Sequence, residues 1–258
     1  MADAIVITGA SSGIGAGFAR RFAARGVDVV LVARRADRLA ALATELESVH
    51  RVTATVLTAD LTDPAAPAAI AQGLHDRGIR AVGLVNSAGF GTAGPFAEED
   101  AVRVAAELQV NVAALTLLTR ELLPQLLAAR GILITISSTA GHQPLPGLAV
   151  YAATKAYVTA LTEAIWQESR GTGLTVLALC PGPTETEFFE VAGSETFKVG
   201  RSVSVDVVLD EAFAALESGR PGPVHTVGAG NRLQGLLGRI SPRRLRLWVA
   251  ARAVGGAR

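Results

Sequence analysis

Short apolar runs alternate along the chain with longer segments in which apolar and polar residues recur at helical spacing. The apolar runs end in polar or glycine-containing turns, as buried strands do. Seven runs predict strands, at residues 4–8, 28–33, 53–58, 81–86, 131–137, 174–180 and 224–227. Six segments between them predict helices, at residues 15–25, 36–48, 64–77, 101–130, 151–169 and 205–218.

This alternation predicts the fold class: α/β, with a single doubly wound parallel sheet (a Rossmann fold) of about seven strands and helices on both faces. Ligands of such sheets bind beyond the carboxyl ends of the strands. No internal repeat or interdomain linker is evident, so we expect one dinucleotide-binding and catalytic domain over residues 1–230. Within it, residues 187–204 have no clear period and are expected to form a substrate lid.

The composition agrees with this fold and restricts the function. Half of the 258 residues are hydrophobic and 5% are aromatic, which suits a parallel sheet covered on both faces. A formal net charge of +1 argues against a nucleic-acid partner. The single cysteine, Cys180, excludes an internal disulfide and is expected to be a small buried side chain. Asp3 stands where a cationic leader would carry Lys or Arg, so we predict no signal peptide and a cytoplasmic protein.

Charge is unevenly distributed. Residues 231–258 contain seven arginines and no acidic residue, so this extension carries +7 and the rest of the chain about −6. Apolar residues lie between the arginines, and Pro242 divides the extension into two short helices. Basic amphipathic helices can lie on an anionic membrane surface, cap a pocket or form a subunit contact. Peripheral membrane contact and docking within the protein or an oligomer therefore stay as alternatives.

A glycine-rich turn joins the first predicted strand to the first predicted helix. Its glycines allow backbone amides at the helix start to approach a pyrophosphate, which the helix dipole attracts. No Lys-Ser/Thr pair follows, so it is not a Walker loop. The position of the turn favours a dinucleotide site. Its candidate contacts are Gly9, Ser11, Ser12, Gly13, Ile14 and Gly15.

The second predicted strand ends in Arg34-Arg35, without an acid. An acid there accepts hydrogen bonds from a ribose 2′-hydroxyl, whereas arginine accommodates a 2′-phosphate. The pair therefore favours NADP(H) over NAD(H), although a solvated basic turn would contain the same residues. After the third strand, Asp60, followed by Leu61, either meets the adenine or caps the next turn.

Small residues follow the fourth predicted strand, in the sequence Asn86-Ser87-Ala88-Gly89. They would let the chain pass close to the adenosine and ribose of a cofactor. Asn86, Ala88 and Gly89 are therefore candidate cofactor contacts, although the segment by itself is an ordinary loop.

A tyrosine and a lysine provide candidate acid–base chemistry. Lys155, one of two lysines, lies four residues after Tyr151, and positions i and i+4 share one face of a helix. An ammonium beside a phenol is expected to lower the pKa of the phenol. Ser138 ends the fifth strand, and Asn111 is a polar residue in an apolar helix face. No metal site is assigned.

Together these motifs resemble the short-chain dehydrogenase/reductase family, over nearly the whole chain to about residue 228. Ser87 replaces the usual second Asn of the family, and the order and spacing of the motifs otherwise agree. The matching motifs are Thr8-Gly9-x-x-x-Gly13-x-Gly15, Asn86-Ser87-Ala88-Gly89, Asn111, Ser138, Tyr151-x-x-x-Lys155 and Pro181-Gly182.

The resemblance implies NADP(H)-dependent hydride transfer between a nicotinamide and a carbonyl/alcohol pair. Tyr151 would be the general acid–base, and Lys155 would lower its pKa and bond to the nicotinamide ribose. Ser138 would hydrogen-bond to the substrate oxygen, and Asn111 would hold a water of a proton relay. The turn after the sixth strand would contact the nicotinamide carboxamide, through Pro181, Gly182, Thr184 and Thr186.

Two other interpretations stay open. A non-catalytic NADP(H)-binding sensor would use the fold only for binding, but sensing needs no proton relay. A nucleotide-sugar epimerase of the extended relatives would share Tyr-x-x-x-Lys. Those relatives usually have Gly-x-x-Gly-x-x-Gly, which the turn at Gly9–Gly15 does not match.

Substrate and assembly follow from the remaining residues. Phenylalanines in the expected lid and after the fourth strand predict an apolar pocket, and hence a hydrophobic ketone or alcohol as the small-molecule substrate, although they could equally pack helices together. They are Phe90, Phe96, Phe188, Phe189 and Phe197. His142 and Gln143 are further candidates for substrate contact, with a solvent-facing loop favoured for His142. Many tetramers of the family associate through a short apolar ending, which this chain lacks. A homodimer through helices 101–130 and 151–169 is therefore favoured over a tetramer.

Overall fold

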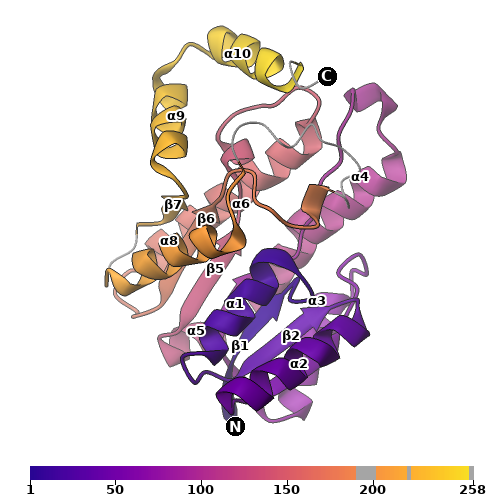
Figure 1. The fold of residues 1–258 in the computed structure, drawn as a ribbon, viewed down its shortest axis with the longest axis vertical. Helices are drawn as coiled ribbons and strands as arrows, with labels where there is room; N and C mark the ends of the chain where they lie inside the picture. The colour runs from indigo at the N-terminus through magenta and orange to yellow at the C-terminus, as the bar shows by residue number, and fades with distance from the viewer. Residues whose placement is uncertain (190–201, 220–221, 256–258) are drawn as a thin grey trace.

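The computed structural model of the protein describes residues 1–189, 202–219 and 222–255 (Figure 1). A seven-stranded parallel sheet forms its centre, in the order β3-β2-β1-β4-β5-β6-β7. The predicted doubly wound sheet is confirmed. Its strands are β1 Ala2–Thr8, β2 Val29–Ala33, β3 Ala54–Thr58, β4 Ile79–Asn86, β5 Ile132–Ile136, β6 Thr175–Cys180 and β7 Val224–Thr226.

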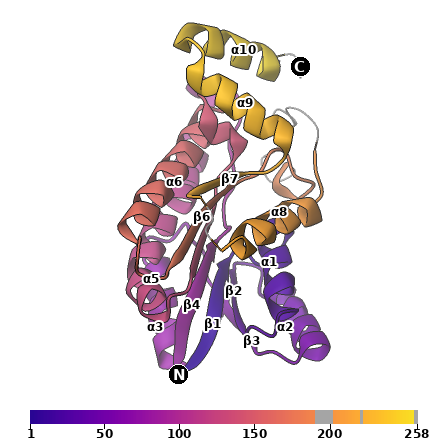
Figure 2. The same ribbon diagram turned by 90° about the vertical axis from the view of Figure 1, so that its left-hand side faces the viewer.

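Helices cover both faces of the sheet, which Figure 2 shows nearly edge-on. One face carries α1, α2 and α8, and the other carries α3, α5 and α6. Near the carboxyl terminus, α9 and α10 extend past the sheet, with Pro242 between them as predicted (Figure 1). The helices are α1 Gly13–Ala23, α2 Ala36–His50, α3 Ala66–Asp76, α4 Ala101–Leu108, α5 Leu115–Ala129, α6 Ala149–Glu168, α8 Val205–Glu217, α9 Ala229–Ile240 and α10 Arg243–Gly255.

The two faces have separate apolar cores. Successive side chains of a strand point to opposite faces, so Ile5 and Ile7 pack on the α1, α2 and α8 side, while Ala4 and Val6 pack on the other. Burial on both faces explains why the central strands read as continuous apolar runs. Cys180 is fully buried, as expected.

The chain diverges between β1 and β4, which are neighbours in the sheet but not in sequence. Thr8 faces Asn86 in the register of this pair. The Thr8 Oγ1 atom accepts hydrogen bonds from the backbone N–H groups of Ser87 and Ala88, both at 3.1 Å. This contact holds the loops after β1 and β4 together at the point where a doubly wound sheet offers a binding crevice.

The predicted helix at 101–130 contains a π-helical segment, η2 (Gln109–Ala114), between α4 and α5. This segment includes the buried Asn111. Its side chain pairs with the backbone of Phe90, with Nδ2 donating to the carbonyl at 2.8 Å and Oδ1 accepting from N–H at 3.2 Å. Such bulges often occur at functional sites, and here the altered turn presents the Asn111 amide to the loop after β4.

The same stretch, Ala101–Ala129, is long and apolar enough to cross a membrane by length and composition only. Its leucines Leu118, Leu122 and Leu126 are buried and pack in the core against the sheet. Core packing therefore accounts for part of its apolar character, while Val102, Leu108 and Leu117 are exposed.

Gly131, which leads from α5 into β5, provides a test of the sheet packing. An added Cβ would lie 1.9 Å from the Val82 carbonyl oxygen of β4. We expect Gly131→Ala to lower the free energy of unfolding by about 1–3 kcal/mol, because the two strands would have to separate. Urea denaturation measures the change. Gly230→Ala, whose Cβ meets nothing within 4 Å, is the control, and equal losses in both variants would contradict the packing argument.

Candidate active site

A cavity of about 610 Å³ opens at the carboxyl ends of the strands. Loops after six strands contribute to it, together with α6 and α9. Three of the predicted residues, Gly15, Asn86 and Asn111, do not line it within the described part of the chain. The other predicted residues do: Gly9, Ser11, Ser12, Gly13, Ile14, Arg34, Arg35, Asp60, Leu61, Ala88, Gly89, Ser138, Tyr151, Lys155, Pro181, Gly182, Thr184 and Thr186.

The three residues outside the lining support it from behind. The close packing of Gly15 leaves no room for a side chain, since its Cβ would lie 2.4 Å from the Gly9 carbonyl oxygen. Asn86 donates from Nδ2 to Thr119 Oγ1 at 2.8 Å. Asn111 has Thr154 Oγ1 as a further partner, at 3.2 Å. Asn86 and Asn111 are therefore buried polar groups with protein partners.

The glycine-rich turn lies between three loops. Gly9 and Gly13 have φ angles of +68° and +53°, which favour glycine. A Cβ on Gly9 would lie 2.8 Å from the Ala88 nitrogen, and one on Gly13 would lie 3.0 Å from Thr186 Cγ2. The turn thus brings the amino end of α1 to the cavity, where its N–H groups and dipole suit a pyrophosphate.

The arginine pair lies at the β2 end of the cavity. Arg35 donates to Ser11 Oγ and to Ser12 Oγ, both at 2.9 Å, and forms an ion pair with Glu187 at 2.7 Å. Asp60 accepts from the Thr62 N–H at 3.0 Å, so it caps the turn, one of its two predicted roles. This hydrogen bond is the main cause that lowers the pKa of Asp60, and the nearby Arg34 acts in the same direction.

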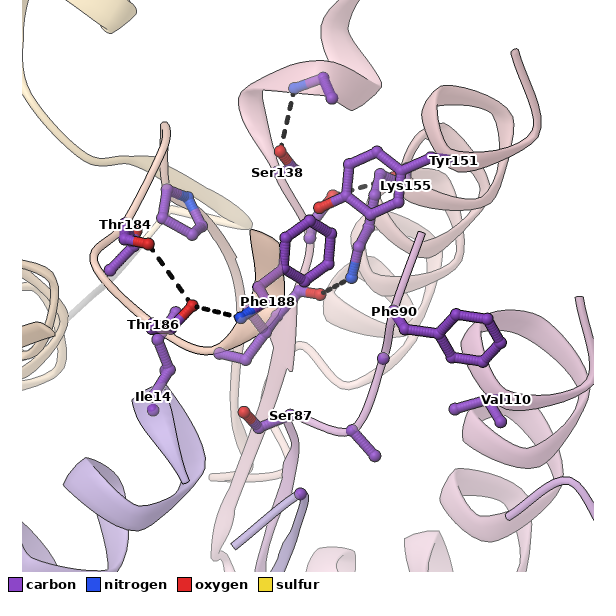
Figure 3. Close-up of a pocket in the computed structure, with 18 of the residues that line it drawn as sticks. Ile14, Ser87, Phe90, Val110, Ser138, Tyr151, Lys155, Thr184, Thr186 and Phe188 are labelled. Atoms are coloured by element: carbon purple, nitrogen blue, oxygen red, sulfur yellow. Dashed lines mark hydrogen bonds between the residues drawn. The ribbon is translucent and has the colours of Figure 1, made fainter. Parts of the chain in front are cut away.

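The catalytic candidates are positioned by contacts between the end of β5 and α6. Ser137 Oγ donates to the Lys155 carbonyl oxygen at 2.8 Å. In η3 (Thr139–His142), Gly141 lies so close to α6 that its Cβ would be 2.7 Å from the Lys155 carbonyl carbon. This packing places Ser138 beside Tyr151, and Figure 3 shows both side chains near Lys155 in the cavity.

The electrostatics of Tyr151 differ from the sequence prediction. Burial raises the pKa of its phenol, and the hydrogen bond with Ser138 only partly opposes this. Lys155 Nζ lies 5.7 Å from the centre of the Tyr151 ring and donates to the Ile136 carbonyl oxygen at 2.8 Å. Burial also lowers the pKa of Lys155, to about 8. The predicted lowering of the Tyr151 pKa by the ammonium is therefore wrong for the protein alone, because desolvation raises this pKa and the effect that opposes it comes from Ser138.

Gly89 leaves room for Lys155 and Asn111 to approach the same point. A Cβ on Gly89 would lie 3.0 Å from Asn111 Oδ1 and 3.5 Å from Lys155 Nζ. The predicted relay residue is thus next to the predicted lysine, with a glycine between their polar atoms.

Comparison with known proteins agrees with this geometry. The family model of the short chain dehydrogenase matches residues 3–196. The chain belongs to the short-chain dehydrogenase family. It is 37% identical over 190 residues to a serine 3-dehydrogenase of Agrobacterium fabrum, covering 73% of this chain and 74% of that one. It is also 37% identical over 191 residues to sulfoacetaldehyde reductase 2 of Chromohalobacter salexigens, covering 73% and 75%.

Two solved structures of the family extend the likeness to most of the chain. A short-chain dehydrogenase from Sphingobium yanoikuyae in complex with NADPH is 35% identical, with a TM-score of 0.81 and 93% of each chain covered. The bulky-bulky ketone specific alcohol dehydrogenase from Comamonas testosteroni is 31% identical, with a TM-score of 0.75 and coverage of 93% and 95%.

In this short-chain dehydrogenase, α9 forms part of the cavity wall. Asn231, Gln234 and Gly235 line the cavity, and a Cβ on Gly182 would lie 2.8 Å from Asn231 Nδ2. Glu211 of α8 fixes this position, because it pairs with Arg232 and accepts from the Gly228 N–H, both at 2.9 Å. The boundary placed at residue 230 stays a prediction. The sequence had allowed the extension to cap a pocket, but it did not identify these wall residues, because only the fold brings them to the loop after β6.

The expected lid is described only in part. Phe188 packs against Tyr151, with ring centres 5.4 Å apart, and Phe189 packs on Phe188. Residues 190–201, with Phe197, lie outside the described residues. Phe90 lines the cavity, but Phe96 is 67% exposed, so its predicted place in the pocket is wrong.

His142 also differs from the favoured prediction of a solvent-facing loop residue. It lines the cavity, as does Gln143, and its Nε2 lies 3.2 Å from Thr226 Oγ1. The ring packs beside α9, since a Cβ on Gly235 would lie 3.4 Å from it.

A buried carboxyl behind the catalytic residues was missed as well. Glu107 is fully buried, and its Oε2 accepts from Thr92 N–H at 2.8 Å, while Oε1 has no hydrogen-bond partner among the described residues. Burial raises its pKa, the charge of Glu99 adds to this, and Thr92 and Lys155 oppose it. An acid four residues before Asn111, on the same helix side, was the available sequence signal.

The burial of the Glu107 carboxyl leads us to expect that the free energy of unfolding depends on pH. Folded Glu107 binds its proton more tightly than unfolded Glu107, so its contribution to the free energy of unfolding falls as pH rises from 4.5, its ordinary value, through the raised pKa. We expect Glu107→Gln to gain stability relative to wild type across that window, measured by urea denaturation at several pH values. Glu98→Gln, at an exposed position, is the control. A constant difference between Glu107→Gln and wild type would contradict the prediction.

Proposed function

We propose that this short-chain dehydrogenase is an NADP(H)-dependent oxidoreductase. It transfers hydride between nicotinamide and a carbonyl/alcohol substrate, with Tyr151 as general acid–base. The observation that carries the proposal is that Ser138, Tyr151 and Lys155 line the same cavity as the glycine turn and the arginine pair. The candidate catalytic residues and the candidate dinucleotide-binding residues thus line one cavity.

Each candidate catalytic residue has a separate role in the proposed hydride transfer. A bound nicotinamide supplies the hydride for reduction of a carbonyl carbon. Tyr151 donates its proton to the substrate oxygen, and Ser138 donates a hydrogen bond to the same oxygen as charge develops. Burial raises the pKa of Tyr151, so the phenol holds the proton that a reduction would deliver. Lys155 binds the nicotinamide ribose, and Asn111 connects the lysine to a proton relay.

The cavity fits a 2′-phosphorylated dinucleotide. The glycine turn is shaped for a pyrophosphate, and Arg34 and Arg35 line the end next to β2 without an acid on the strand end. The NADPH complex of the Sphingobium relative, at 35% identity, supports the same preference.

An apolar surface surrounds the reacting end and supports a hydrophobic ketone or alcohol as substrate. Leu145, Leu148, Phe188 and Phe189 pack together with Tyr151. The arginines in the described lining are Arg34 and Arg35, at the β2 end of the cavity. This surface suits the bulky ketones named for the Comamonas relative.

The alternative of a non-catalytic sensor has no support from the relatives above, which are named as dehydrogenases and a reductase. The same names favour hydride transfer over nucleotide-sugar epimerisation.

We also propose a cytoplasmic homodimer. Exposed apolar side chains on the helices of 101–129 and on α6 support this interface: Val102, Leu108, Leu117 and Tyr157. Thr116 and Tyr157, 3.0 Å apart, hydrogen-bond between the two helices. On α9 and α10 the exposed leucines lie among arginines, which suits a peripheral contact with an anionic membrane or with a second subunit.

The substitution Tyr151→Phe tests the proposed role of Tyr151 as the general acid. We expect NADPH binding to persist and kcat to fall by about 10²–10⁴-fold, because the proton donor is lost. Steady-state kinetics with a panel of hydrophobic ketones measures this. Tyr157→Phe removes the hydroxyl of the other tyrosine, which is 40% exposed, and should leave kcat unchanged. Turnover of Tyr151→Phe close to wild type would remove the proposed acid.

The cofactor preference is tested by Arg34→Ala. Loss of a charged hydrogen-bond partner of the 2′-phosphate should weaken NADPH binding by about ten- to hundredfold and NADH binding far less. Fluorescence titration gives both dissociation constants. Arg20→Ala, which removes a surface ion pair with Glu45, controls for net charge. Equal losses for the two cofactors would refute the phosphate contact.

A further inference from the structure

The carboxylate of Glu187 bridges two arginines across the cofactor cavity. One oxygen pairs with Arg35 Nη1 at 2.7 Å, and the other pairs with Arg38 Nη1 at 2.5 Å. Arg35 caps the amino end of α2 and Arg38 lies in the first turn of this helix, whereas Glu187 follows Thr186 in the segment after β6. An acid that is absent from the end of β2 in sequence is therefore supplied by a residue about 150 positions away.

Every nitrogen of the Arg35 fork has a partner in this arrangement. Nε and Nη2 donate to Ser11 Oγ, and Nη2 also donates to Ser12 Oγ. Nη1 donates to Glu187. A phosphate that binds Arg35 through two parallel N–H groups must therefore replace the hydroxyls, the carboxylate, or both.

Because Glu187 is negatively charged, it can compete with a phosphate for Arg35. Its hydrogen bonds to Arg35 and Arg38 lower the pKa of its carboxyl, so it is ionised at neutral pH. Both arginines and Glu187 are between a third and a half exposed, and such ion pairs are weak enough for a phosphate dianion to displace. Asp60, the other acid in the described part of the lining, lies near Arg34.

We propose that Glu187 is a specificity-determining residue, whose carboxylate competes with the 2′-phosphate of NADPH for Arg35 and Arg38. The competition lowers the affinity for the phosphorylated cofactor and leaves a 2′-hydroxyl cofactor nearly unaffected. The preference for NADPH is thus smaller than the arginines alone would give. This inference rests on the proposed 2′-phosphate site.

The position of Glu187 links this competition to the reacting end. The next residue, Phe188, packs against the Tyr151 ring, and its N–H donates to Thr186 Oγ1 at 3.2 Å (Figure 3). Release of Glu187 by a 2′-phosphate frees one end of the segment that carries this phenylalanine.

The test compares Glu187→Gln with wild type in binding of 2′,5′-ADP and 5′-ADP, by isothermal titration calorimetry, followed by NADPH and NADH. Glutamine keeps the size and removes the charge. We expect the affinity for 2′,5′-ADP and NADPH to rise about three- to tenfold, with 5′-ADP and NADH unchanged. Glu185→Gln removes the same charge two residues away and should leave all four affinities unchanged.

Three outcomes would overturn the inference. Weaker NADPH binding in Glu187→Gln would mean that the carboxylate clamps the cofactor in place. An equal gain for all four ligands would mean that the ion pairs only restrict access to the cavity. No change would mean that the phosphate does not meet Glu187. In each case Arg35→Ala, measured beside it, reports separately on the 2′-phosphate site: selective loss of 2′,5′-ADP binding keeps the proposed function, and equal loss of 5′-ADP binding rejects it.

Discussion

Close backbone contact at the carboxyl edge of the sheet is the constraint on which the site depends. Thr8 Oγ1 holds the N–H groups of Ser87 and Ala88, and Gly9 fits against Ala88 with no room for a Cβ. Because the chain leaves β1 and β4 towards opposite faces, this contact determines the width of the crevice between them. Gly13 extends the contact to Thr186, after β6. Three loops are thereby held at separations that any larger residue would change.

Burial has two opposing effects at the reacting end. It places Tyr151, Lys155 and Asn111 in a low-dielectric space where hydrogen bonds and charges act strongly. It also disfavours the phenolate and the ammonium, so the pKa of Tyr151 is raised and the pKa of Lys155 is lowered. Both shifts favour the uncharged side chain. The raised pKa favours the protonated phenol, and the hydrogen bond with Ser138 opposes this shift. The lysine matters chiefly through its position, fixed by the Ile136 carbonyl beside Gly89.

Local patterns predicted the strands, because buried parallel strands are apolar on both faces. They also predicted many of the residues that line the cavity, because parallel strands place their carboxyl ends at one edge. The residues after β6 came from the family resemblance. Contacts between distant segments could not be read this way. The partners of Glu187 lie at the start of α2, some 150 residues earlier. Asn111 pairs with Phe90, and His142 packs beside α9. The direction of the Tyr151 pKa shift depends on how far the fold excludes water from the phenol. The spacing of Tyr151 and Lys155 in the sequence gives no information on this.

The family match includes the candidate catalytic residues but not the part of the cavity wall that α9 forms. The family model ends at residue 196, and Ser138, Tyr151, Lys155 and the glycine turn all lie within it. The wall formed by α9 lies outside it, yet Asn231 touches Gly182 in the loop after β6. Glu211 ties α9 to α8 and to β7, so this wall is part of the sheet's last crossover and not a loose appendage. The described lining residues beyond the matched range all belong to α9. Replacements in α9 would therefore change the shape of the cavity while leaving Ser138, Tyr151 and Lys155 in place.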